Sequence, residues 1–126
     1  VQQPPAPPPP GGDIAGTAGN DTASPAGALA GARVDLGAGF DRLFLSSAGD
    51  NTVTVANTEE VWGGSRNDSV TLATASNDIG VALGAGNDRL VLFSGAVNAV
   101  RVSGIETIVG GAQNDTVTVF LGMSGT

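Results

Sequence analysis

The sequence predicts an all-β protein, a parallel β-solenoid or β-roll of about five coils that occupies residues 13–126. Three observations favour this fold class. The chain of 126 residues contains 20 glycines, strong helix formers are scarce, and one ten-residue phrase occurs twice. The segment LGAGFDRLFL (36–45) recurs in similar form as LGAGNDRLVL (83–92), and the distance between the two defines a 47-residue repeat. A period of this length is typical of proteins in which similar coils are stacked along one axis.

The first segment, residues 1–12, is rich in proline (VQQPPAPPPPGG). Proline favours the extended polyproline II conformation, so we expect an extended arm or a linker here. The chain begins without Met, which is expected of a processed N-terminus or of an excised fragment. We favour a signal peptide removed before Val1, which predicts a secreted protein, extracellular or at the cell surface.

Beyond this arm the 47-residue period covers the chain. Residues 36–79 align without a gap with residues 83–126, and 19 of the 44 pairs are identical. Glycine-rich turns at successive spacings of 20, 27, 20 and 27 end in Asp21, Asp41, Asp68, Asp88 and Asp115. A second series with the spacings 20, 27 and 20 comprises Gly31, Asn51, Asp78 and Asn98. Two series with the same spacings predict two columns of turns along the stack, one formed by the five aspartates and one by this weaker series. We therefore interpret each unit as a 20-residue coil and a 27-residue coil, the longer with a third corner near Asn57 and Gly104.

Short runs of strand-forming residues separate the turns, and several alternate between apolar and polar positions. Residues at the second and fourth positions after a turn aspartate should point inward and stack: Leu43, Leu45, Val70, Leu72, Leu90, Leu92, Val117 and Val119. Their neighbours should point outward: Arg42, Thr54, Thr71, Arg89, Arg101 and Thr118. Pro25 cannot donate to a strand ladder, so we expect residues 14–35 to be the least regular part.

The turns have the chemistry of a calcium site. Glycine permits positive φ and a crowded backbone, and calcium accepts six to eight oxygen ligands from carboxylates and carbonyls. The candidate ligands are Asp21, Asp41, Asp68, Asp88 and Asp115, with Gly19, Gly39, Gly64, Gly86 and Gly111. An alternative stays open, because aspartate and asparagine also cap turns and form ladders without a metal.

The turns also resemble the repeats-in-toxin (RTX) family, whose Gly-Gly-x-Gly-x-Asp repeats form parallel β-rolls that bind calcium. The matching positions are Gly16, Gly19 and Asp21; Gly37, Gly39 and Asp41; Gly63, Gly64 and Asp68; Gly84, Gly86 and Asp88; Gly110, Gly111 and Asp115. No turn carries the whole motif, since Leu36 and Leu83 replace its first glycine. The resemblance is to degenerate variants in large secreted bacterial surface proteins, and it implies calcium binding outside the cell.

Composition excludes several function classes. A formal net charge of −7 argues against nucleic acid and anionic lipid as partners. Cysteine and histidine are absent, so the chain offers no zinc site and no thiol or imidazole catalyst. We expect no enzyme activity, no small-molecule substrate and no membrane insertion. Threonine rows suggest an ice-binding face that arginine and aromatic residues interrupt, and Trp62 is interpreted as core or edge cover in preference to a sugar platform.

The two ends of a coil stack present unpaired backbone groups that another chain can extend. We therefore expect a secreted structural subunit, a calcium-stabilised solenoid that polymerises end to end with copies of itself. The product would be an extracellular filament or a surface layer. The alternative is a calcium-binding repeat segment, a spacer or folding aid, within a larger secreted adhesin or enzyme.

Overall fold

A computed structural model describes residues 13–74 and 77–119 of the chain. The predicted arm at residues 1–12 and the end of the predicted solenoid, residues 120–126, lie outside the described residues. Twelve strands and no helix are formed within the described ranges. The prediction of an all-β fold is therefore confirmed.

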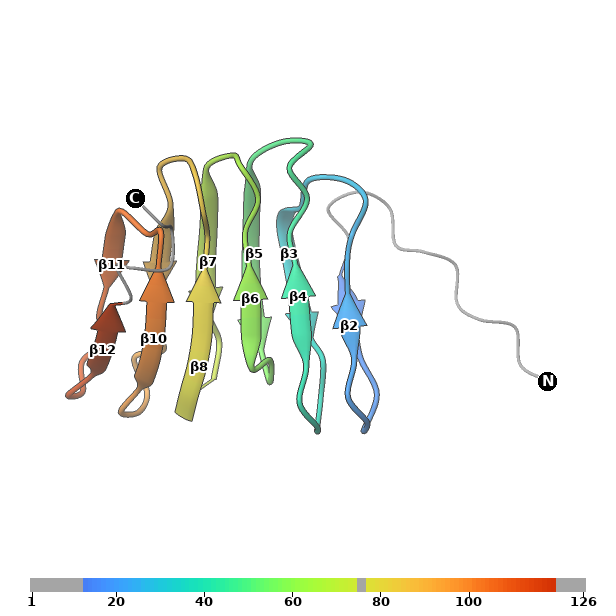
Figure 1. The fold of residues 1–126 in the computed structure, drawn as a ribbon. Coiled ribbons are helices and arrows are strands. Elements are labelled where there is room, and N and C mark those ends of the chain that lie inside the picture. The colour runs from blue at the N-terminus through green and yellow to red at the C-terminus, as the bar shows by residue number, and fades with distance from the viewer. Residues whose placement is uncertain (1–12, 75–76, 120–126) are drawn as a thin grey trace.

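The strands form two six-stranded parallel sheets, which we name after the parity of their strand numbers (Figure 1). The odd sheet contains β1 (Ile14–Ala15), β3 (Ala30–Asp35), β5 (Asn51–Ala56), β7 (Asp68–Leu72), β9 (Arg89–Val91) and β11 (Thr107–Val109). The even sheet contains β2 (Thr22–Ala23), β4 (Arg42–Phe44), β6 (Glu60–Trp62), β8 (Asn77–Ala82), β10 (Ala99–Ser103) and β12 (Thr116–Val119).

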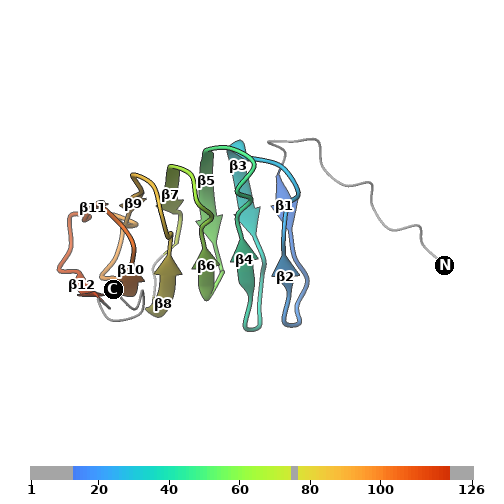
Figure 2. The ribbon, with the colours of Figure 1, turned by 45° about the horizontal axis from the view of Figure 1, so that its top comes forward.

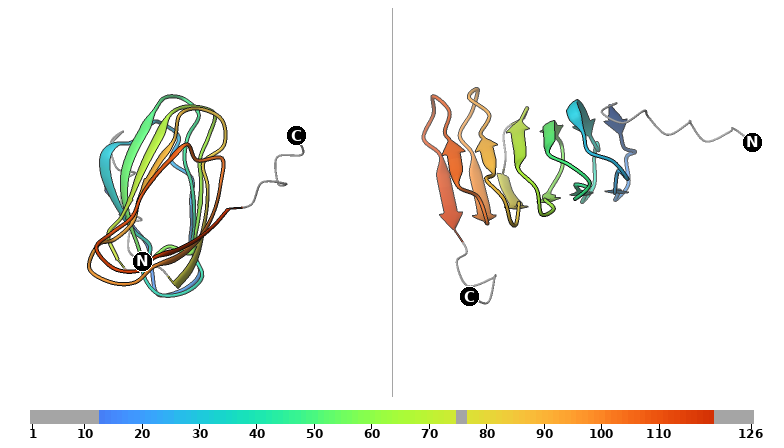
Figure 3. Two further views of the ribbon diagram at one scale, coloured as in Figure 1. Left: turned by 90° about the vertical axis from the view of Figure 1, so that its left-hand side faces the viewer. Right: turned by 90° about the horizontal axis from the view of Figure 1, so that it is seen from above.

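Each strand pairs with the strand two places further along the chain, so every coil gives one strand to each sheet. The two rows of strands face one another along the whole stack (Figure 2). Seen along its axis, the stack is a flattened tube with the sheets as its long sides (Figure 3). This is the β-solenoid of about five turns that the repeat predicted.

The core is a column of apolar side chains between the sheets. Leu43, Val70 and Leu90 are fully buried, and Leu45, Leu72 and Leu92 at the next inward positions are also buried. Each stacks on a residue of the neighbouring coil, as Leu90 does on Val70. Burial of a leucine side chain stabilises the fold by about 1.5–3 kcal/mol. These inward positions were predicted correctly, and the predicted outward residues, such as Arg42 and Arg101, lie on the surface.

The coil lengths differ from the predicted alternation of a 20-residue and a 27-residue coil. Leu90 is the register partner of Val70, at a sequence separation of 20, but Val70 is the partner of Val53, at a separation of only 17. The largest separation between partners is 22, from Ala30 to Thr52 and from Asn77 to Ala99. No coil in the described ranges is as long as the predicted longer one. The 47-residue repeat instead corresponds to two and a half coils, so Leu43 lies in β4 of the even sheet and Leu90 in β9 of the odd sheet.

The predicted third corner is one of the two corners that every coil has. Asn57 and Gly104, with φ of 49° and 60°, lie in short connections between β5 and β6 and between β10 and β11. Gly31 and Asp78 of the weaker series also have positive φ, 80° and 72°, and lie where the strand register shifts. They are β-bulges, each of which lengthens its coil by a single position. The weaker series is therefore not a column of turns.

The two ends of the stack are less regular than its middle. The first coil contains the shortest strands, β1 and β2, so the expected irregularity is found before β3, whereas residues 30–35 form the six-residue strand β3. In the last described coil, Val117 and Val119 pair with Val100 and Val102 and continue the inward row. They therefore stack on their equivalents one coil away, as predicted, but their exposed fractions are 36% and 52%. No further described coil covers them.

Two glycines, Gly84 and Gly80, provide a test of how closely each coil stacks on the preceding one. A Cβ added to Gly84, at φ +86°, would lie 2.6 Å from the carbonyl oxygen of Gly64 in the preceding coil, whereas one added to Gly80 would meet nothing within 4 Å. We expect Gly84→Ala to lower the free energy of unfolding by about 1–3 kcal/mol. Gly80→Ala should leave it unchanged or raise it by less than about 1 kcal/mol. Urea unfolding followed by circular dichroism measures both, and equal losses would contradict the described stacking.

Candidate functional site

The five turn aspartates form two columns, not the single column that their spacing predicted. Asp21, Asp41 and Asp115 end turns that lead from the odd sheet into the even sheet, and we call this side the first edge. Asp68 and Asp88 lie where the chain enters the odd sheet, on the opposite, second edge. The reason is the half coil in the 47-residue repeat, which moves each successive unit to the other side of the tube.

On the second edge, side chains and backbone groups form a hydrogen-bonded ladder that runs from coil to coil. The amide nitrogen of Asn51 donates to Asp68 Oδ1 at 2.7 Å. The backbone N–H of Asp68 donates to Asp88 Oδ1 at 2.7 Å, and the backbone N–H of Asp88 donates to Glu106 Oε2 at 2.8 Å. Each acceptor thus pairs with an N–H group of the preceding coil. Leaving such a group buried and unpaired would cost free energy.

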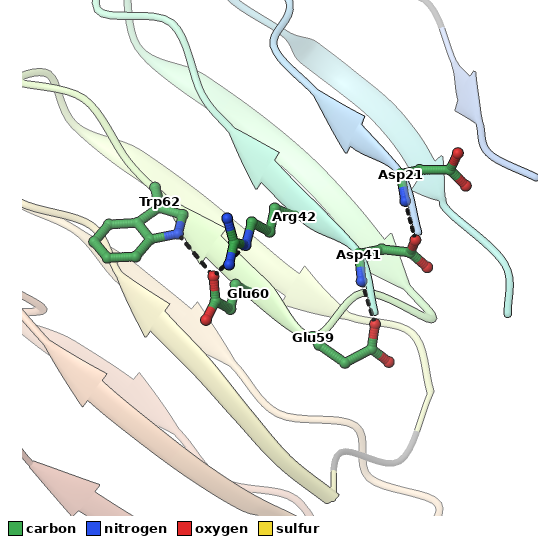
Figure 4. A network of polar contacts seen from close by, with 6 residues as sticks. All are labelled: Asp21, Asp41, Arg42, Glu59, Glu60 and Trp62. Carbon is green, nitrogen blue, oxygen red and sulfur yellow. Dashed lines mark hydrogen bonds and ion pairs between the residues drawn. The ribbon is translucent and has the colours of Figure 1, made fainter. Parts of the chain in front are cut away.

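The first edge repeats the same arrangement (Figure 4). The backbone N–H of Asp21 donates to Asp41 Oδ1 at 2.6 Å, and that of Asp41 donates to Glu59 Oε2 at 2.8 Å. Further along this edge, Asn98 donates to Asp115 Oδ1 from its backbone and from its side chain. Sequence reasoning missed the ladder role of Glu59 and Glu106, although the two glutamates align in the 47-residue repeat.

Three of the aspartates also close their own turns. Asp21, Asp68 and Asp115 each accept a hydrogen bond from the backbone N–H four positions earlier, at Thr17 (2.6 Å), Gly64 (3.2 Å) and Gly111 (2.8 Å). The N–H of Gly111 and the side-chain amide of Asn98 hold the pKa of Asp115 below its ordinary value of 3.8. These contacts are the turn-capping role that the alternative interpretation expected.

Asp41 and Asp88, one in each column, have a different environment. Both carboxyl groups are fully buried, and in both Oδ2 is buried without a hydrogen-bond partner. Burial raises the pKa of Asp88 to about 6, and the nearby carboxylates of Asp68 and Glu106 add to the shift against the opposing effect of the Asp68 N–H. A buried carboxylate oxygen with no partner is unfavourable unless a proton or a cation neutralises it.

The turn glycines permit the close stacking of one turn on the next. Gly37 and Gly39 have φ of 87° and 112°, and their equivalents Gly84 and Gly86 have φ of 86° and 124°. A Cβ on Gly39 would lie 2.6 Å from the carbonyl oxygen of Gly19, because that oxygen points at the following turn. The predicted glycines divide as the aspartates do: Gly19, Gly39 and Gly111 lie on the first edge, and Gly64 and Gly86 on the second.

The donor chemistry of these turns fits calcium, which prefers hard oxygen ligands. The unpartnered oxygens of Asp41 and Asp88 are the side-chain atoms that would hold an ion, with backbone carbonyls as additional ligands. Within the described residues, no group of three or more acidic, histidine or cysteine side chains is arranged to hold a metal. Carboxylates alone therefore do not complete a site, and most ligands would have to come from the backbone.

No family model, curated protein or solved structure matches the chain. Among the described residues, none belongs to a helix with the length and hydropathy of a membrane span.

The raised pKa of Asp88 predicts an unusual dependence of stability on pH. Between about pH 4 and pH 6 the folded chain holds a proton on Asp88 that the unfolded chain has released. The free energy of unfolding in metal-free buffer should therefore fall by on the order of 2 kcal/mol as the pH rises through this range, and then level off.

Asp88→Asn should remove this fall, since asparagine cannot titrate and Asn51 and Asn98 already occupy ladder positions. Asp50→Asn, at an exposed turn residue, is the control and should retain it. The measurement is urea unfolding at a series of pH values. The prediction would be contradicted if the free energy of unfolding rose from pH 4 to pH 6 by the same amount in the wild type and in both variants.

Proposed function

We propose that the chain is a structural subunit of the cell exterior, an RTX-like β-solenoid that binds calcium at its stacked turns and assembles end to end into a filament or surface layer. The observation that carries this proposal is the open core at the last described coil. Val117 and Val119 continue the inward row of the even sheet but are exposed. The backbone edges of β11 and β12 have no further strand beyond them in the described ranges.

The internal repeat supplies a reason why a second copy fits this end. Two 47-residue periods relate Ile14 to Ile108 and Asp21 to Asp115, and two periods amount to five whole coils. The first and last described coils therefore have their turns on the same edge and their strands in the same sheets. A copy stacked with its first coil on β11 and β12 would continue both sheets and both ladders in line. Such a head-to-tail contact does not close and produces a filament.

Calcium binding is supported by the unpartnered oxygens of Asp41 and Asp88. A bound cation would neutralise a column of carboxylates that otherwise repel one another within a chain of net charge −7. Binding that occurs only in the folded state would also couple folding to the calcium-rich exterior of the cell. The proposed role of the ion is structural, because its ligands belong to turns that hold coils together.

Calcium should raise the stability of the chain. At about 100 times its dissociation constant, one ion bound only to the folded state adds about 2.7 kcal/mol to the free energy of unfolding. Thermal unfolding followed by circular dichroism, in calcium and in EGTA, measures the difference. The double variant Asp41→Asn, Asp88→Asn should lose the calcium effect, and Asp50→Asn should retain it. A melting temperature that ignores the chelator would exclude the calcium part of the proposal.

Assembly is tested at the open end. Negative-stain electron microscopy and sedimentation velocity of the purified chain should show filaments that lengthen with protein concentration. Val119→Asp places a charge in the exposed inward row and should prevent them. Val97→Asp is the control, because Val97 is 58% exposed in the loop between β9 and β10. Filaments that persist in Val119→Asp, with the fold retained, would contradict end-to-end stacking.

The second candidate function is a calcium-binding repeat segment within a larger secreted adhesin or enzyme. The open core at Val117 and Val119 also favours this candidate. Further coils of one longer chain would cover these two residues just as a second copy would. The two candidates differ in assembly but not in calcium dependence. Isolated particles at every concentration, together with a calcium-dependent melting temperature, would favour the segment over the filament.

A further inference from the structure

Two aromatic side chains lie side by side on the outer face of the even sheet. Phe44 on β4 and Trp62 on β6 are register partners, and their rings are parallel within 7° with centroids 6.1 Å apart. Their exposed fractions are 37% and 44%, so the interpretation of Trp62 as a core residue is wrong. Exposed aromatic surface of this kind is typical of an interaction site.

Polar groups border the aromatic pair, and one of them bonds to the indole of Trp62. Arg42 Nε lies 3.0 Å from Glu60 Oε1, and the same oxygen accepts a hydrogen bond from the indole nitrogen of Trp62 at 3.4 Å (Figure 4). The guanidinium of Arg42 also lies 5.7 Å from the centre of the Phe40 ring. We call Phe44, Trp62, Arg42 and Glu60 the aromatic cluster. Its one arginine and one glutamate balance each other, so the cluster has no net charge although the chain is acidic.

The internal repeat shows that the fold does not require this cluster. In the second unit, β9 and β11 pair in the same register, and Val91 and Val109 occupy the positions of Phe44 and Trp62. Thr107 stands in the position of Glu60, opposite Arg89. The outward positions of the unit thus tolerate small residues. The aromatic pair and its carboxylate are features of the first unit alone.

The next strand leaves the cluster open on one side. Gly80 and Ala82 of β8 are the register partners of Glu60 and Trp62. A Cβ added to Gly80 would meet no atom within 4 Å. The surface beside Trp62 is therefore a shelf of small residues along the solenoid axis, with room for a flat group against the indole.

We propose that this cluster binds a neutral polysaccharide, with sugar rings against Trp62 and Phe44 and hydroxyl groups bonded to Arg42 and Glu60. The C–H groups on one face of a pyranose ring are weakly positive and pack on the negative face of an aromatic ring. A carboxylate accepts and a guanidinium donates hydrogen bonds, and a hydroxyl group does both. The balanced charge of Arg42 and Glu60 favours a neutral polysaccharide over a charged one. A protein partner would instead anchor in a desolvated apolar pocket, whereas the neighbours here are Gly80 and Ala82.

The chain offers a direct probe, because Trp62 is its one tryptophan and it contains no tyrosine. Titration with cellohexaose should change the fluorescence of Trp62 in a saturable manner, and regenerated cellulose should retain the protein from solution. Phe44→Val should weaken cellohexaose binding about tenfold, a loss of one stacked ring. Trp62→Val should abolish retention on cellulose, and circular dichroism should show an unchanged fold because Val109 occupies the equivalent place.

Val91→Ala on the odd sheet is the control and should bind as the wild type does. The proposal is overturned if cellohexaose leaves the Trp62 fluorescence unchanged and cellulose does not retain the protein. It is also overturned if Trp62 responds to protein concentration instead and Trp62→Val reduces self-association, since the surface would then join copies of the chain. Sugar binding that persists in Val119→Asp and in EGTA would separate this site from end-to-end assembly and from calcium.

Discussion

The hydrogen bond from the backbone N–H at the end of one turn to a side-chain oxygen of the next coil is the interaction on which the stack depends. Inside a sheet, backbone pairs with backbone, but at the edges the chain turns and that pairing stops. Asp41, Asp88 and the glutamates Glu59 and Glu106 supply the missing acceptors. The glycines of the same turns let successive backbones approach closely enough for these bonds to form.

This ladder concentrates acidic groups along two edges, and that concentration is the source of the proposed calcium dependence. Asp88 lies between Asp68 and Glu106 and keeps one oxygen buried without a partner. A proton at low pH and a cation at neutral pH are two ways to neutralise the same charge. The edges thus hold neighbouring coils together and are also the place of the proposed response to calcium and pH.

Three roles lie on different parts of the molecule: the inward sheet faces form the core, the open end is the proposed site of assembly, and the outer face of the even sheet is the proposed sugar site. The inward rows of leucine and valine hold the coils together, and the same rows are exposed at Val117 and Val119, where a further coil would add. The outer face of the even sheet carries Trp62, Phe44 and the Arg42–Glu60 ion pair. A filament with this cluster in every subunit would present a row of sugar sites, and repetition of weak sites along one polymer raises the overall affinity.

The sequence by itself determined the parallel solenoid, the inward positions and the glycine turns, because apolar alternation and turn chemistry are local properties. Only the tertiary structure decided the coil lengths, since these depend on corners and on bulges such as Gly31 and Asp78, whose effect is seen only when strands pair. The 47-residue repeat corresponds to two and a half coils, and the half coil places Asp41 and Asp88 on opposite edges. Turns that are regularly spaced along the chain therefore do not all lie in one column. The Phe44–Trp62 cluster likewise arises from register across two coils, which no local pattern shows.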